Sequence, residues 1–212
     1  MPSFCVDGIL NDKPVGFFTA SDTPYGKTYG NWTVEWWRWI LGIPKRINPV
    51  VDMSGKYSTM NQLNRDVLFL AGKLAEKGKS LPERSCKVSG QKAILVPVIN
   101  CEANPLENPE LKSYKDIEQR AKSDEDTIVS YHCHVDGKAV PVHRVRSDPL
   151  IFEVRLVEDN LFSVQGGLTH ASADGYWTFL KPLPRGEHTI SFQGSCEMGR
   201  LHSGAIYKVH IE

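Results

Sequence analysis

The 212-residue chain has no excess of charge of either sign, because 25 Lys and Arg residues balance 25 Asp and Glu residues. No overall electric field therefore draws in nucleic acid or an anionic membrane. No apolar run is long enough to span a bilayer, and residues 1–16 lack the basic start, apolar run and cleavage site of a signal peptide. We expect neither a nucleic-acid partner nor a membrane partner.

Familiar catalytic motifs are also missing. The sequence has no P-loop, GxGxxG, HExxH, GxSxG or EF-hand pattern. Its cysteines are odd in number, widely spaced and without a CxxC pair: Cys5, Cys86, Cys101, Cys133 and Cys196. Such a set in a chain without a visible leader predicts reduced thiols and a cytoplasmic location. Secretion is the alternative if a leader was removed.

What the sequence does contain is a series of short strand-like segments. Period-two alternation, as in residues 151–156, is typical of strands with one buried face. Turn dipeptides separate the segments, and Asp136-Gly137 is the strongest hairpin signal. Other turns are expected at Ser89-Gly90, Gly166-Gly167, Asp174-Gly175 and Arg185-Gly186. The expected strands are 15–19, 67–71, 86–88, 93–99, 127–135, 138–142, 150–156, 176–180, 188–193 and 205–211.

Many strands without βαβ alternation predict a mainly β protein. We expect a single domain over residues 1–212, built as a two-sheet antiparallel β-sandwich of jelly-roll or immunoglobulin-like type. Residues 42–64 are rich in Pro, Asn, Ser and Gly and predict an ordered loop. Residues 70–79 fit either a strand end or a short helix.

Two segments have the pattern of helices. Residues 31–41 (NWTVEWWRWIL) can be capped by Asn31 or Thr33, and Gly42 with Pro44 ends the helix. The apolar stripe of this helix contains Trp32, Trp36, Trp39 and Ile40, with Trp37 off the stripe. Residues 109–122 predict a polar surface helix with Asn108 as cap and Pro109 at its first position.

Three sequence blocks resemble a mostly bacterial protein family that has no assigned activity. They are residues 29–55 (with NWTVEWWRWILGIP), residues 67–104 (with AILVPVIN) and residues 174–194 (DGYWTFLKPLPRGEHTISFQG). The resemblance implies an architecture and no chemistry, and many relatives in this family are secreted. The last block also resembles the final hairpin of immunoglobulin-like sandwiches.

Three histidines form the best metal-site candidate. If 131–135 pairs with 138–142, His132 and His134 share one face of the hairpin and His143 lies diagonally to His132. Three neutral imidazoles can bind zinc or iron and leave a position for water, which suits a hydrolase or a cupin-like oxygenase. The alternative is two exposed histidines on a solvent-facing strand, with Cys133 pointing into the core.

The tryptophans and one strand end supply candidates for ligand binding. Trp37 can present an aromatic platform or pack in the core, and either Tyr176 or Trp177 should face outward or into a cleft. Asn100 and Glu102 follow an apolar strand, where polar groups can meet a ligand. Cys101 between them is either a reactive thiol or a buried inert one.

Arg144 and Arg146 alternate on a strand, where guanidinium groups can bind a carboxylate or phosphate or simply face solvent. Our leading interpretation is a binding module for a small ligand such as a carbohydrate or metabolite. Its cleft would be formed by the Trp-rich helix with loops 42–64 and 166–175. The alternatives are the metal-dependent enzyme and a structural or assembly protein, and the oligomeric state stays open.

Overall fold

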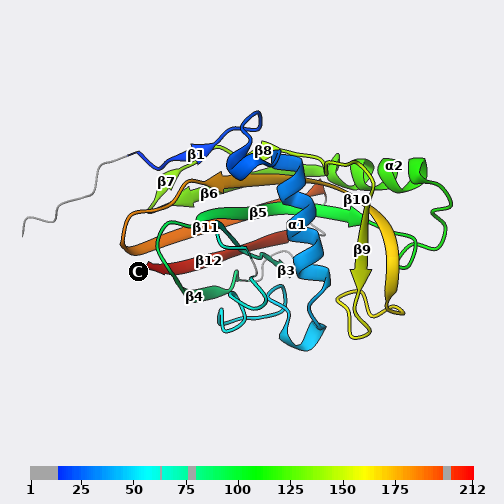
Figure 1. Cartoon of the computed structure of the whole chain (residues 1–212), viewed down its shortest axis with the longest axis horizontal. Helices are drawn as coiled ribbons and strands as arrows, with labels where there is room; N and C mark the ends of the chain where they lie inside the picture. Colours follow the sequence, from blue (N-terminus) through cyan, green and yellow to red (C-terminus); the bar gives the residue numbers. More distant parts are fainter. Residues whose placement is uncertain (1–13, 63, 76–79, 198–201) are drawn as a thin grey trace, which may run out of the picture.

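A computed structural model describes residues 14–62, 64–75, 80–197 and 202–212. It has two β-sheets packed face to face, with helix α1 (Tyr29–Leu41) lying across the outer face of one of them (Figure 1). The expected two-sheet β-sandwich is therefore confirmed. Cys5 and part of the ambiguous segment 70–79 lie outside the described residues.

The sheet next to α1, here called sheet A, is built around the long strands β5 and β10, which pair antiparallel. Strand β2 is parallel to β5 at one edge. Strands β1, β8 and β9 pair with different parts of β10. The bounds in sheet A are β1 Phe17–Phe18, β2 Val67–Phe69, β5 Ala93–Ala103, β8 His143–Arg144, β9 Phe152–Leu156 and β10 Gly167–Leu180.

The opposite sheet, sheet B, has β12 and β11 at its centre and the hairpin β6–β7 at one edge. Strand β3 pairs antiparallel with one part of β12, and β4 runs parallel to another part. The bounds in sheet B are β3 Lys73–Ala75, β4 Glu83–Val88, β6 Ile128–Val135, β7 Lys138–Ala139, β11 Gly186–Cys196 and β12 His202–Ile211. Each of the ten expected segments overlaps a strand. Strand β3 lies in segment 70–79, for which a strand end or a short helix was expected, and β8 was not expected as a strand.

Turn chemistry predicted some connections correctly and one wrongly. The β6–β7 hairpin turns at Asp136-Gly137, and both residues have positive φ, as this two-residue turn requires. Asp174-Gly175, however, lies inside β10, and no turn is formed there. Residues 167–175 are consequently strand, so they cannot form the ligand-binding loop that we expected from 166–175.

Helix α1 begins earlier than the sequence suggested. Thr28 is the cap: its hydroxyl accepts from the Asn31 N–H at 3.0 Å, and the Asn31 side chain accepts from the Thr28 N–H at 3.0 Å. The predicted caps at Asn31 and Thr33 are therefore wrong, while the predicted end before Gly42 is confirmed. Short 3₁₀ turns at Pro24–Gly26 and Lys45–Ile47 flank the helix.

Helix α2 (Tyr114–Glu125) begins later than expected, at Ser113, which forms a reciprocal capping box with Asp116. The predicted cap Asn108 and first-turn Pro109 thus lie in the preceding turn. Helix α2 packs through Ile117 and Ala121 against Ala103 of β5. The described residues contain no helix that is both long and apolar enough to cross a bilayer.

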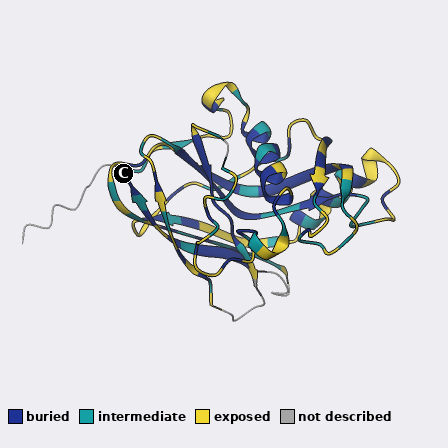
Figure 2. Ribbon diagram, turned by 60° about the horizontal axis from the view of Figure 1, so that its bottom comes forward, coloured by how far each residue is buried: buried dark blue, intermediate teal, exposed yellow. Residues whose placement is uncertain are grey.

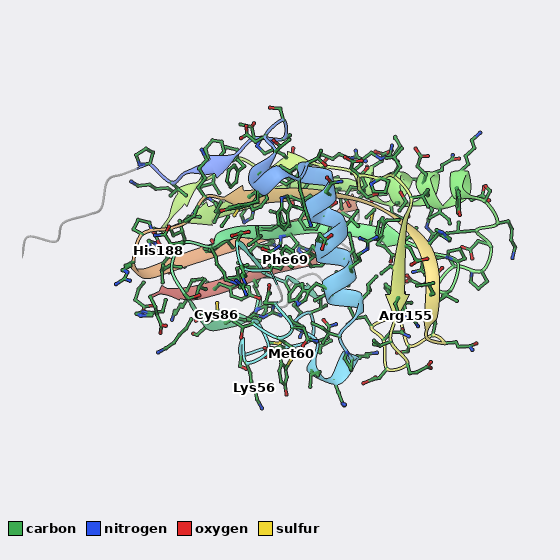
Figure 3. The ribbon with its side chains drawn as sticks, viewed as in Figure 1. Lys56, Met60, Phe69, Cys86, Arg155 and His188 are labelled. Atoms are coloured by element: carbon green, nitrogen blue, oxygen red, sulfur yellow. The ribbon has the colours of Figure 1, made fainter. Side chains whose placement is uncertain are left out.

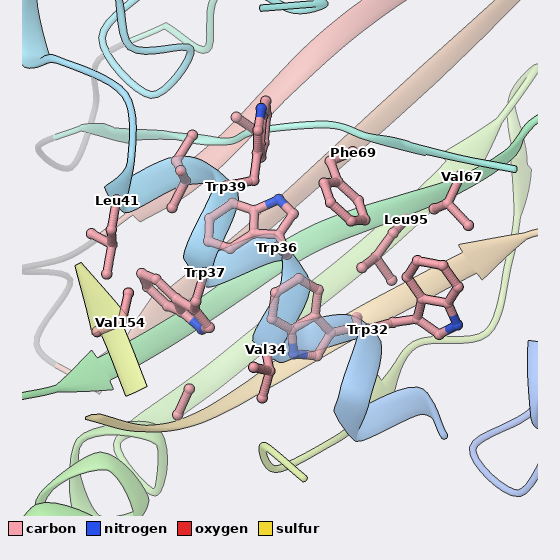
Figure 4. Packing of buried hydrophobic residues seen from close by; sticks show 14 of the residues in the cluster. Trp32, Val34, Trp36, Trp37, Trp39, Leu41, Val67, Phe69, Leu95 and Val154 are labelled. Atoms are coloured by element: carbon pink, nitrogen blue, oxygen red, sulfur yellow. The ribbon is translucent and has the colours of Figure 1, made fainter. Parts of the chain in front are cut away.

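The buried residues of the two sheets and of α1 (Figure 2) form two main apolar layers. One lies between sheets A and B and includes Val96, Phe192 and Tyr207. The other lies between sheet A and α1, where the helix buries all four of its tryptophans (Figure 4). Met60 and Phe69 lie beside this helix (Figure 3) and contact Trp39. Trp37 is buried although it lies off the expected stripe, because strands and loops cover α1 on more than one side.

Candidate functional site

A pocket of about 250 Å³ opens beside α1, between the helix and three other segments of the chain. Its walls come from the helix, from the segment after the turn Lys45–Ile47, from the start of β3 and from the loop after β9. The lining residues are Trp36, Trp37, Ile40, Val50, Val51, Gly72, Lys73, Leu74, Asn100, Leu161, Phe162 and Ser203. Most of these side chains are apolar, with a few polar groups among them, as is usual for small-molecule sites.

The aromatic wall of the pocket is a chain of edge-to-face indoles. The Trp36 ring lies 4.9 Å from the Trp37 ring at 89° and 5.4 Å from the Trp177 ring at 78°. This geometry is the favoured arrangement of aromatic quadrupoles and holds the rings in place. Trp177 is fully buried one layer deeper, so Trp36 and Trp37 are the indoles that reach the pocket.

The indole N–H groups of the five tryptophans fall into two sets. Those of Trp32, Trp36 and Trp39 donate to the carbonyls of Pro24, Leu70 and Met60 at 2.9, 2.7 and 2.7 Å. Those of Trp37 and Trp177 are buried and have no acceptor within the described structure. Because buried polar groups are almost always paired, an unpaired indole in a pocket wall indicates a place for a ligand acceptor.

Asn100 forms the polar part of the pocket floor. It sits on β5 opposite Gly175 of β10, on the side that faces α1, and its buried Nδ2 has no partner in the part of the chain that the structure describes. A Cβ on Gly175 would lie 2.5 Å from Asn100 Cβ and 2.6 Å from Trp177 Nε1. Because Gly175 has no side chain, the side chains of Asn100 and Trp177 can occupy the space above it.

Glu102 lies two residues further along β5, on the same side of the sheet as Asn100, but it does not line the pocket. Its two carboxyl oxygens accept from Asn104 Nδ2 at 3.0 and 3.3 Å. Burial raises the pKa of Glu102 to about 8, and the Asn104 hydrogen bond offsets only part of this shift. Of the two polar groups predicted at this strand end, only Asn100 reaches the pocket.

Arg144 and Arg146 lie on the opposite face of sheet A, next to α2. Arg144 contacts Asp174 and Asp126, each at 2.7 Å, and Arg146 contacts Glu118 at 3.1 Å. Asp174 is buried, so these ion pairs anchor α2 and β8 to β10. Both guanidinium groups are thus held by carboxylates of the protein and lie away from the pocket.

Cys101 also faces α2, because it alternates with Asn100 and Glu102 on β5. Its thiol donates to the Ala121 carbonyl at 3.0 Å. Burial, with the nearby Glu125 carboxyl, raises the pKa of this thiol far above its usual range. The geometry agrees with an inert thiol, and Cys86 and Cys133 are likewise free, buried or half-buried thiols.

The structure separates the three histidines that we expected to share a face. His132 and His134 are neighbours on the outer face of β6 in sheet B, with ring centroids 5.5 Å apart. The chain then crosses to sheet A, where His143 pairs opposite Trp177 and its ring packs edge-on against Tyr29. The expectation of one shared face is wrong, and the described residues contain no cluster of three metal-binding side chains.

A second, more open hollow of about 640 Å³ lies on another flank of α1, around Trp39 and Phe69. Among its polar groups, Glu35 contacts Lys27 at 3.3 Å, and Asn64 accepts from two backbone N–H groups. The pocket at Trp37 differs because two of its side chains, Trp37 and Asn100, have a buried nitrogen without a partner among the described residues. We therefore take the Trp37 pocket as the candidate site.

Neither a protein-family model, nor a curated protein, nor a solved structure matches this chain. The site must therefore be interpreted from its own chemistry. Sequence reasoning found Trp37, Asn100 and the loop 42–64, but it missed Lys73, Ser203 and the loop carrying Phe162. No local pattern marks those residues, because they reach the pocket only through long-range pairing of β3 with β12 and of β9 with β10.

Proposed function

We propose that this protein is a binding module for a small metabolite, which occupies the pocket at Trp37. The observation that carries the proposal concerns Trp37, a residue that lines the pocket and is only 7% exposed. Its indole N–H is buried and has no acceptor among the described residues. An unpaired buried donor costs about 1–3 kcal/mol. A ligand oxygen placed at this N–H removes that cost.

The size of the pocket limits the ligand. A volume of about 250 Å³ corresponds to roughly eight water molecules at about 30 Å³ each. This suits a compound with one ring or a short hydrocarbon chain. The edge of Trp36 and the side chains of Ile40, Leu161 and Phe162 favour an apolar body.

A ligand screen with a blocked variant tests the proposal. Val51 lines the pocket and is 40% exposed, so Val51→Trp should obstruct the pocket mouth without disturbing the core. Val129→Trp, at a 60% exposed position on β6, is the matched control. Compounds found by ligand-observed NMR should bind wild type and Val129→Trp equally and bind Val51→Trp at least tenfold more weakly. Hits that bind Val51→Trp as well as wild type would refute the site.

A further inference from the structure

Two side chains that line the pocket carry hydrogen-bond donors without acceptors in the described segments. We infer that its ligand is an organic carboxylate with an apolar body, an inference that rests on the proposed function and specifies its ligand class. Trp37 and Asn100 both line the pocket, and the buried Trp37 Nε1 and Asn100 Nδ2 have no hydrogen-bond partner among the described residues.

The charged groups around the pocket also favour a ligand with a negative charge. Lys73 lines the pocket, and within the described structure its amine contacts only the Met53 thioether, at 2.9 Å, and no carboxylate. No Asp or Glu is among the described residues that line the pocket. A ligand cation or a donor-rich ligand would place N–H against N–H, whereas a carboxylate only accepts hydrogen bonds.

The number of donors favours a carboxylate over a phosphate. The two unpaired nitrogens, Trp37 Nε1 and Asn100 Nδ2, supply one donor atom for each oxygen of a carboxylate, and one lysine matches its single charge. A phosphate monoester carries up to two charges and three terminal oxygens, which usually require several cationic groups or a row of backbone N–H groups. The apolar walls then receive the hydrocarbon part, and burial strengthens the charge-assisted hydrogen bonds.

The test uses one apolar body with different head groups: phenylacetate, phenylacetamide, phenethylamine and phenyl phosphate. Each compound is titrated into full-length protein labelled with ¹⁵N at the tryptophan indoles. The five indole signals report on five sites, and Trp37→Phe and Trp39→Phe assign two of them. Trp39 is the matched control, because it lies on the same helix and its N–H already donates to Met60.

We expect phenylacetate to bind at least tenfold more tightly than phenylacetamide or phenethylamine and to shift the Trp37 signal downfield, with the Trp39 signal unmoved. Lys73→Met should weaken phenylacetate binding about tenfold and leave phenylacetamide binding unchanged. The indole signals that remain in each variant verify that it is folded.

Three outcomes would overturn the inference, and they separate it from the proposed function. Equal binding of phenylacetamide and phenylacetate at Trp37 would retain the pocket and reject the carboxylate. Tighter binding of phenyl phosphate would reject the carboxylate in favour of a phosphate. Failure of all four compounds to shift the Trp37 signal at millimolar concentration would reject both the carboxylate and the pocket as a site for ligands of this size.

Discussion

Glu102 places a carboxyl group in the interior of the protein, and this has a measurable consequence for stability. The side chain is 9% exposed, and its hydrogen bonds within the described structure come from the Asn104 amide. Burial disfavours the charged form and raises the pKa from 4.5 to about 8. Glu102→Gln keeps the shape and an oxygen acceptor for Asn104 but has no proton to lose.

The direction in which pH changes the stability follows from the protons bound by the folded and unfolded chains. Between pH 4.5 and about 8 the folded protein holds a proton on Glu102 that the unfolded chain has released. Raising the pH through this window therefore favours the unfolded chain, by about 1.4 kcal/mol per pH unit for one group. The stability linked to Glu102 is fully present below pH 4.5 and lost as the pH rises through about 8. The Glu102→Gln variant does not lose this stability, because glutamine has no carboxyl proton to release.

Urea denaturation at pH 5, 6, 7 and 8 measures the effect as the difference in free energy of unfolding between Glu102→Gln and wild type. We expect a difference near zero at pH 5 that grows with pH to on the order of 3–4 kcal/mol in favour of the variant at pH 8. Glu118→Gln, on the surface of α2, is the control and should run parallel to wild type. A constant difference between Glu102→Gln and wild type over the four pH values would refute the burial argument. Glu125, whose pKa is also raised to about 8 by burial, lies on the other side of sheet A and contributes equally to both proteins.

Two further substitutions test the packing around the site. A Cβ on Gly194 would lie 2.4 Å from Ile99 Cγ2, so Gly194→Ala should destabilise the sandwich by roughly 1–3 kcal/mol. Ile99→Ala should recover part of this loss in thermal denaturation of the double variant, and strictly additive effects would contradict the inferred clash. Asn48 is fully buried; its amide donates to the carbonyls of Ile40 and Ile43 and accepts from the Val50 N–H. Asn48→Ala should cost at least about 2 kcal/mol in urea denaturation, and a cost below about 0.5 kcal/mol would show that these bonds are replaced by water.

The sequence predicted the features that depend on neighbouring residues. The Asp136-Gly137 hairpin follows from turn chemistry, and the end of α1 follows from Gly42. Helix starts were less accurate, because Thr28 and Ser113 compete as caps with other polar residues nearby. Asp174-Gly175 has the composition of a turn, yet Gly175 serves a close approach between strands. Composition alone does not distinguish these two uses of glycine.

The residues of the candidate site also divide into those with a local sequence signal and those without one. Trp37 and Asn100 were singled out because a tryptophan off the helical stripe and a polar strand end are unusual in themselves. Lys73 and Phe162 have no such local mark. His143 was misplaced because the strand pairing of the β6–β7 hairpin was expected to continue too far along the chain. Strand β7 ends at Ala139, and the chain then leaves sheet B for sheet A. A register that is correct near a turn does not tell where the strand stops.

The parallel pairing of β4 with β12 has a consequence for synthesis on the ribosome. Glu83–Val88 finds its described sheet partner only in residues 206–211, so this strand is made long before the one that receives it. Until β12 emerges, β4 keeps an open edge and Val88 lacks the layer that buries it. Sheet B therefore closes late and over a large separation in sequence, which slows folding. A nascent chain stalled before residue 202 would be the form most exposed to chaperones and to pairing with other chains.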